Sequence, residues 1–263
     1  MSYPRPFHRN YRPLIKGPNS GYSSWKYITD HEYSNNPTQY TRAFFMIQKD
    51  LKELFEYVEP ADVNLSTYSH RIQQLLIRTC IEIEANFKAI LLENKYSKIK
   101  KNLNRDDYKI INKTHHLSGY SVQFPYWNGT KNDFKPFLEW DSTRSGKLDW
   151  YDAYNDCKHD RSNAFMLANL KNLLNSISAL QILITSQFGH YSFEPGDMTL
   201  SIDDNGYYDG DFGIGEYMLI KEPTDWEDEE KYDFNWEDLC NESDRFAKID
   251  YDHIKMISKK QEN

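Results

Sequence analysis

Trp150-Tyr-Asp-Ala-Tyr-Asn-Asp-Cys-Lys-His-Asp-Arg161, followed at once by an apolar-periodic segment from Ala164 to Phe188, is the stretch that decides the fold. In the second part, apolar side chains recur every three or four residues, which predicts a helix with one buried face. Gly189 comes next and is expected to end this helix. The first part predicts a helix that begins at Asp149 and breaks near residues 161–163.

The first part also carries the densest chemistry of the chain. If it is helical, Asn155, Lys158 and His159 project from one side of the helix, with Tyr151 one turn earlier. An amide, a cation and an imidazole then share one small surface, which suits a site for an anion or a phosphate group. A second interpretation is structural. In it Asn155 braces the helix, Lys158 is solvated, and His159 bonds to Glu84 or to a backbone carbonyl.

Two long helices are predicted before this stretch. Apolar side chains recur at helical spacing over residues 38–58, and Pro60 ends that segment. The next helix begins at Asn64 or Ser66 and runs to about residue 92. Glu84 lies within it and either points toward the Asn155 and His159 face or is solvated.

Residues 120–140 change character, because Val122, Phe124 and Tyr126 alternate with other residues and Asn128-Gly129 is a turn signal. This pattern predicts a β-hairpin or an extended excursion inserted between helices. The fold class is therefore mainly α with a small β insertion.

Composition shifts divide the chain into three parts. We expect an irregular N-terminal arm at residues 1–36, a helical domain at 37–189 with the β insertion, and an acidic, irregular and partly β extension at 190–263.

Basic residues gather in residues 1–26 and 88–113, although the net charge is -8. The first stretch interleaves arginine with tyrosine, which either grips nucleic acid or packs across the domain. The acidic excess lies almost wholly after Glu194, and its densest part is in 225–244. That segment is a solvated tail, a partner-binding strip or a cover for a basic face, and we expect the first.

The chain has three cysteines, which are widely spaced and form no CxxC pair. They favour a cytoplasmic protein and argue against a disulfide framework and a zinc site. No run reaches the roughly 18 apolar residues of a membrane span, and the amino terminus lacks the apolar core of a signal peptide. His115 and His116 are adjacent and point apart on a helix, so we expect surface residues, no metal and no cofactor.

Two motifs, Pro136-Phe-Leu-Glu-Trp140 and Tyr154-Asn-Asp-Cys-Lys-His159, the latter continuing to Arg161, resemble a group of bacterial proteins with a Tyr-Asn-x-x-Lys-His-x-Arg pattern. With the long helices around them, they resemble the HEPN superfamily over residues 38–189. The resemblance implies an antiparallel four-helix bundle and a metal-independent ribonuclease of a toxin–antitoxin or phage-defence system. It also implies RNA, a partner protein such as an antitoxin, or a second copy as the binding partner.

The family's catalytic pattern places an arginine before the polar residue and the histidine. Asn155 and His159 match the last two positions, but Tyr154 stands where the arginine is expected. Lys158, Arg161 or an arginine from a second copy would then supply the cation that stabilises charge on the phosphate. A lysine lacks the bidentate fork of an arginine.

We therefore expect a noncatalytic RNA- or protein-binding module with a degenerate ribonuclease motif, and the alternative is a metal-independent endoribonuclease. The catalytic candidates are His159, Asn155 and Lys158, and the substrate-binding candidates are Arg161, Tyr154, Tyr151 and Glu84.

Overall fold

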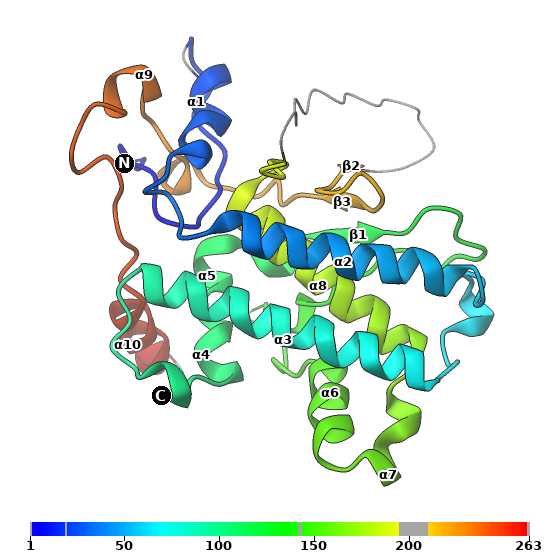
Figure 1. Cartoon of the computed structure of the whole chain (residues 1–263). Coiled ribbons are helices and arrows are strands. Elements are labelled where there is room, and N and C mark those ends of the chain that lie inside the picture. Colours follow the sequence, from blue (N-terminus) through cyan, green and yellow to red (C-terminus); the bar gives the residue numbers. More distant parts are fainter. Residues whose placement is uncertain (1, 19, 142–143, 195–209, 262–263) are drawn as a thin grey trace.

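The computed structural model describes residues 2–18, 20–141, 144–194 and 210–261, and it is mainly helical with a small antiparallel sheet (Figure 1). None of the helices in these ranges is long and apolar enough to cross a membrane. The helices are α1 (Ser20–Lys26), α2 (Pro37–Phe55), α3 (His70–Glu93), α4 (Arg105–Lys109), α5 (Asn112–His115), α6 (Asp149–His159), α7 (Arg161–Ala164), α8 (Leu170–Phe188), α9 (Trp236–Leu239) and α10 (Tyr251–Gln261), and the strands are β1 (Ser121–Gln123), β2 (Asp211–Phe212) and β3 (Leu219–Lys221).

The predicted long helices are confirmed, with boundaries set by their caps. Ser69 accepts a hydrogen bond from the backbone N–H of Ile72 at 3.2 Å, so α3 begins later than the apolar pattern suggested. Asn169 caps α8 in the same way at 3.0 Å. The expected break near residues 161–163 corresponds to the short helix α7 and a 3-10 turn before α8. Side-chain capping therefore decides where these helices start.

The core lies between α3 and α8, which pack along each other, with α2 above α3 and α6 below it in the view of Figure 1. From Leu173 onward most of α8 is buried, including polar side chains. Gln187 shows how these are accommodated, because its amide donates to the side-chain oxygen of Asn86 at 2.9 Å. Each fully buried leucine or isoleucine contributes about 1.5–3 kcal/mol to stability. This packing holds α3 and α6 in fixed positions.

The prediction of a β-hairpin within residues 120–140 was wrong about which segment pairs with β1. Val122 meets Phe134 in one antiparallel bridge, but the strand β1 pairs along its length with β3, and β3 pairs with β2. Val122 and Ile220 are register partners and both are buried. The burial of these apolar side chains, which lie far apart in the sequence, decides the pairing over the local turn signal.

The N-terminal arm is wrapped by the end of the chain. Backbone N–H groups of Tyr3 and Ile15 donate to the carbonyls of Lys231 and Tyr232, at 2.9 and 2.8 Å. Trp236 and Tyr232 are buried among the aromatic side chains of this region, so the expected solvated tail was wrong. The blue arm and the orange segment with α9 lie together in Figure 1. The burial of aromatic side chains outweighs the solvation of the acidic residues between them.

The expectation that His115 and His116 lie at the surface was also wrong. His115 is fully buried, and its Nε2 is 2.8 Å from the backbone oxygen of Arg9. Burial lowers the pKa of His115 to about 3, so the ring is neutral near pH 7. His116 stacks on the ring of Trp226 at 3.9 Å. Both histidines therefore join the arm and the end of the chain to α5.

Candidate functional site

Helix α6 presents one apolar and one polar side. Trp150, Ala153, Tyr154 and Cys157, spaced by three, one and three residues, are buried against α3 and α8. The indole N–H of Trp150 also donates to the Pro136 carbonyl at 2.9 Å. This anchoring fixes the rotation of the helix and so decides where the side chains of the motif point.

Glu84 on α3 is the centre of the contacts made by the motif. The hydroxyl of Tyr151 donates to one oxygen of its carboxylate at 3.1 Å, and the ammonium of Lys88 approaches the other at 3.1 Å. The Glu84 side chain is 21% exposed, so this carboxylate stands at the edge of the core, where such contacts have less competition from water than at an open surface. The sequence left two orientations open for Glu84, and the contact with Tyr151 corresponds to the one that points toward α6.

The hydroxyls of the tyrosines around Glu84 keep their protons near neutral pH. Burial raises the pKa of Tyr151, and the charge of Glu84 raises it further. The pKa of Tyr154 is raised by the same two causes in the same order. Both hydroxyls therefore stay protonated at ordinary pH and remain available as hydrogen-bond donors.

Lys158 and Asn155 bond within their own helix. The ammonium of Lys158 is 3.3 Å from the hydroxyl oxygen of Tyr154 and 5.3 Å from the centre of its ring. The side-chain amide of Asn155 donates to the backbone carbonyl of Tyr151 at 3.1 Å. These contacts agree with the interpretation in which Asn155 braces the helix.

His159 is the last residue of α6 and is exposed. Among the described residues its ring makes no hydrogen bond, ion pair or ring contact, so Glu84 does not hold it. Arg161 begins α7, and its side chain lies outside the described residues. The structure therefore brings together Glu84, Tyr151, Tyr154 and Lys158, and it leaves His159 outside that group.

Two neighbours of this cluster were missed by sequence reasoning. Lys88 follows Glu84 by four residues, and that spacing is a usable signal for a helical ion pair. Tyr108 on α4 stacks on Phe87 at 4.9 Å, and its pKa is raised first by burial and then by the charge of Glu84. The position of Tyr108 depends on how α4 folds back onto α3, for which the sequence offers no local signal.

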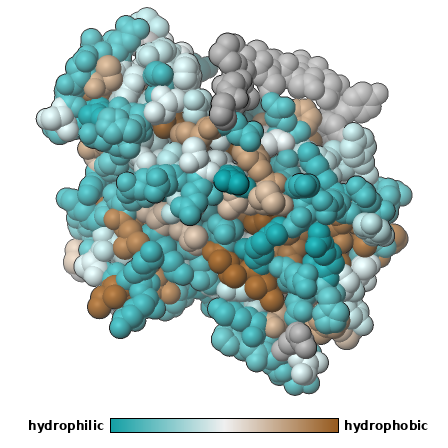
Figure 2. Space-filling view, in the orientation of Figure 1, coloured by the Kyte–Doolittle hydropathy of each residue, from teal (hydrophilic) through white to brown (hydrophobic). Residues whose placement is uncertain are grey.

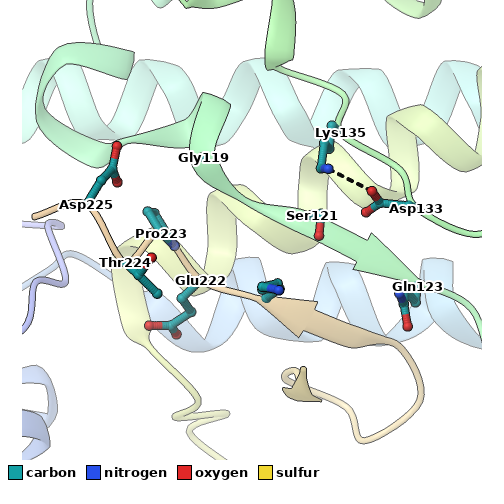
Figure 3. A pocket seen from close by; sticks show the side chains of 10 residues that line it. Gly119, Ser121, Gln123, Asp133, Lys135, Glu222, Pro223, Thr224 and Asp225 are labelled. Carbon is teal, nitrogen blue, oxygen red and sulfur yellow. Dashed lines mark ion pairs between the residues drawn. The ribbon is translucent and has the colours of Figure 1, made fainter. Parts of the chain in front are cut away.

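A polar pocket of about 430 Å³ lies beside the sheet, between β1, the loop around Asp133 and the residues after β3 (Figure 3). Its charged groups are already matched: Lys135 pairs with Asp133 at 2.7 Å, and Glu222 is 3.2 Å from His190. The pKa of His190 is raised because the neighbouring Glu222 outweighs the effect of burial. In the described part of the chain no three His, Cys, Asp or Glu side chains form a group that could hold a metal ion.

Comparisons of the chain with models of protein families, with curated proteins and with solved structures found no match.

Proposed function

We propose that this chain is a noncatalytic protein-binding module, built on an HEPN-like antiparallel four-helix bundle of α2, α3, α6 and α8, in a bacterial defence or toxin–antitoxin system. One observation carries the proposal. Asn155 and Lys158 bond within α6, Tyr151 bonds to Glu84, and His159 is exposed outside this group, so the three catalytic candidates do not converge on one point.

Catalysis by the motif would need several groups to converge on one phosphate. Cleavage through a 2′-hydroxyl requires a proton acceptor held near the reacting oxygen and a cation near the phosphate. A catalytic histidine is normally oriented by a third group, whereas His159 is exposed and has no such partner in the described residues. Tyr154, at the position of the family's arginine, is 1% exposed. These features support a binding role over a ribonuclease.

A protein partner is favoured over RNA by the apolar side chains on the outer side of α3. Ile81 is 52% exposed and Leu92 is 44% exposed on that helix, and Met46 is 52% exposed on α2. Apolar groups gathered on one face are typical of protein-binding surfaces, whereas RNA is held mainly by phosphate contacts and base stacking. RNA remains the second outcome that the test below measures.

The test is incubation of the purified chain with mixed cellular RNA in excess chelator, beside His159→Ala and Asn155→Ala. We expect intact RNA on the gel with all three proteins, and only weak, salt-sensitive retention of labelled RNA on a filter. Cleavage by the wild type that both variants lose would contradict the proposal and establish an endoribonuclease that uses His159 and Asn155.

A further inference from the structure

The outer side of α3 carries a stripe of exposed and half-buried side chains at the spacing used by helices that pack on other helices. Alternate steps of three and four residues connect Arg78, Ile81, Ala85, Lys88 and Leu92. Figure 2 shows apolar side chains gathered over this helix, in the middle of the face that Figure 1 presents. From Ile81 to Leu92 the stripe is roughly 17 Å long, which matches about three turns of a partner helix.

The stripe borders hollows on both sides of the α2–α3 pair. One hollow of about 450 Å³ is lined by Ile81, Ala85 and Leu92 and reaches Tyr40 at the start of α2. Another, of about 500 Å³, lies over Met46 and its neighbours on α2. Arg78 connects the two helices, because its guanidinium donates to the backbone carbonyl of Met46 at 3.5 Å. Ala85, with its small side chain, lets another helix approach closely.

The charges of this face that have no partner are positive. Arg78 pairs with Asp50, and Lys88 pairs with Glu84. Burial raises the pKa of Glu82, and the charge of Arg78 only partly opposes this shift. In contrast, Arg42, Lys95 and Lys100 are exposed and form no ion pair within the described residues. Lys100 lines the same hollow as Ile81. A partner that meets this face therefore gains most from carboxylates.

A second copy of the chain fits this stripe poorly. If two α3 helices met antiparallel around residue 83, Ile81 would face Ala85, but Arg78 would face Lys88. Like charges across a helix pair are destabilising, so the arrangement disfavours self-association.

We propose that the face formed by α2 and the outer side of α3 binds an acidic amphipathic helix of another protein. The apolar side of that helix lies on Ile81, Ala85 and Leu92, and its carboxylates lie toward Arg42 and Lys100. This inference rests on the proposed function, because it names the surface and the chemistry of the partner.

The experiment titrates the full-length chain against two labelled synthetic helical peptides by fluorescence anisotropy. Both peptides carry the same leucine and alanine stripe at three- and four-residue spacing, and they differ in having glutamates or lysines beside it. We expect the glutamate peptide to bind at least about tenfold more tightly. Equal binding of the two peptides, or no binding of either, would overturn the inference.

Matched variants locate the surface. Ile81→Lys should weaken the glutamate peptide by about tenfold or more, whereas Val63→Lys, at a side chain that is 84% exposed in the turn before α3, should not change the affinity. The double variant Arg42→Glu and Lys100→Glu should reverse the preference toward the lysine peptide, with an unchanged helical circular dichroism spectrum. Ile81→Lys binding as well as the wild type would contradict the proposed surface.

The oligomeric state and the RNA assay separate the remaining explanations. If the wild type sediments as a dimer and Ile81→Lys as a monomer, the face binds a second copy of the chain, and this inference is overturned. RNA cleavage that depends on His159 would instead contradict the proposed function. Failure of the peptide to bind with RNA left intact would refute only the partner surface.

Discussion

Two groups of cations, one from each basic stretch, lie in opposite environments. In residues 1–26, Arg9 is fully buried and Arg12 is 4% exposed, whereas Lys95, Lys100 and Lys101 of the second stretch are exposed. The guanidinium of Arg9 pairs with Glu93 and donates to Gln187, both at less than 3 Å. A basic stretch therefore indicates an external partner only where the chain does not supply the counter-groups itself.

The burial of the arm has a clear physical cause. Arg12 donates to the backbone oxygen of Glu230 at 2.8 Å and lies 5.4 Å from the ring of Trp226, so the acidic segment and its aromatics enclose it. The nucleic-acid grip that the sequence allowed for this arm is not available, because its arginines are already bonded. The alternative expectation, an arm packed across the domain, is what the structure has.

The largest expected effect comes from Arg9→Met. This variant leaves Glu93, 12% exposed, without its cation, and removing one partner of a buried pair costs about 3–5 kcal/mol. Denaturant unfolding should show the loss as a lower midpoint. The matched control is Arg5→Ala in the same arm, where the pair with Glu242 is exposed to water and screened by it, so the midpoint should hardly move. Equal losses in the two variants would erase the distinction between buried and exposed cations.

The second prediction concerns pH and the contact between His115 and the arm. The folded pKa of about 3 lies below the ordinary value of 6.5, so the folded state binds fewer protons between these values. Stability should be complete above pH 6.5 and should fall by about 1.4 kcal/mol per unit as the pH drops toward 3. Unfolding free energies measured from pH 7 to pH 4 check this.

The matched comparison is His115→Gln, which should flatten the pH dependence over the same range. Asp107, whose pKa is lowered by its contacts with Lys255 and Lys98, destabilises the fold only when it is protonated below its ordinary value of 3.8. An unchanged slope between pH 6.5 and 4 in the variant would refute the assignment to His115.

The third prediction is that the side chains of the α6 motif, like those of the arm, stabilise the fold through their contacts. Tyr151→Phe removes one hydrogen bond to Glu84 and should cost about 0.5–1.5 kcal/mol. Thermal unfolding should therefore shift downward by a few degrees. Tyr57→Phe is the control, since that side chain is 85% exposed. If the two variants melt alike, the contact with Glu84 does not support the fold.

The smallest expected effect belongs to the exposed stretch. Lys100→Ala and Arg42→Ala should change the free energy of unfolding by less than about 0.5 kcal/mol, because neither side chain is paired within the described residues. Chemical denaturation provides the measurement. A loss above 1 kcal/mol in either variant would show that the side chain belongs to the folded structure and not to a free surface.

Local patterns in the sequence predicted the parts of the fold that depend on local chemistry. The periodic segments became α2, α3 and α8, and the rotation of α6 placed Tyr151 toward α3. The pairing of β1 with β3 was missed, because it joins residues about 100 positions apart and depends on the burial of Val122 and Ile220. The burial of His115 was missed for the same reason, since its partner is the distant backbone of Arg9.

The candidate site likewise has one part that local sequence patterns indicate and another that depends on the tertiary fold. The contact of Glu84 with the motif is one of the two alternatives that the sequence left open, and it follows from the sides of two helices on which the side chains lie. The exposure of His159 could not be predicted, because it depends on α6 ending at that residue and on α7 turning away. An apolar stripe with cations around it also has the same local pattern whether it is covered or free.

The most direct test of the account compares the α3 stripe with the α6 motif in one binding measurement. The glutamate peptide is titrated into Ile81→Lys and into the double variant Lys158→Ala with His159→Ala, beside the wild type. The account predicts that Ile81→Lys binds the peptide about tenfold or more weakly than the wild type does. The motif variant should bind the peptide as tightly as the wild type. Loss of binding in the motif variant, with Ile81→Lys unaffected, would contradict it and place the binding site at the end of α6.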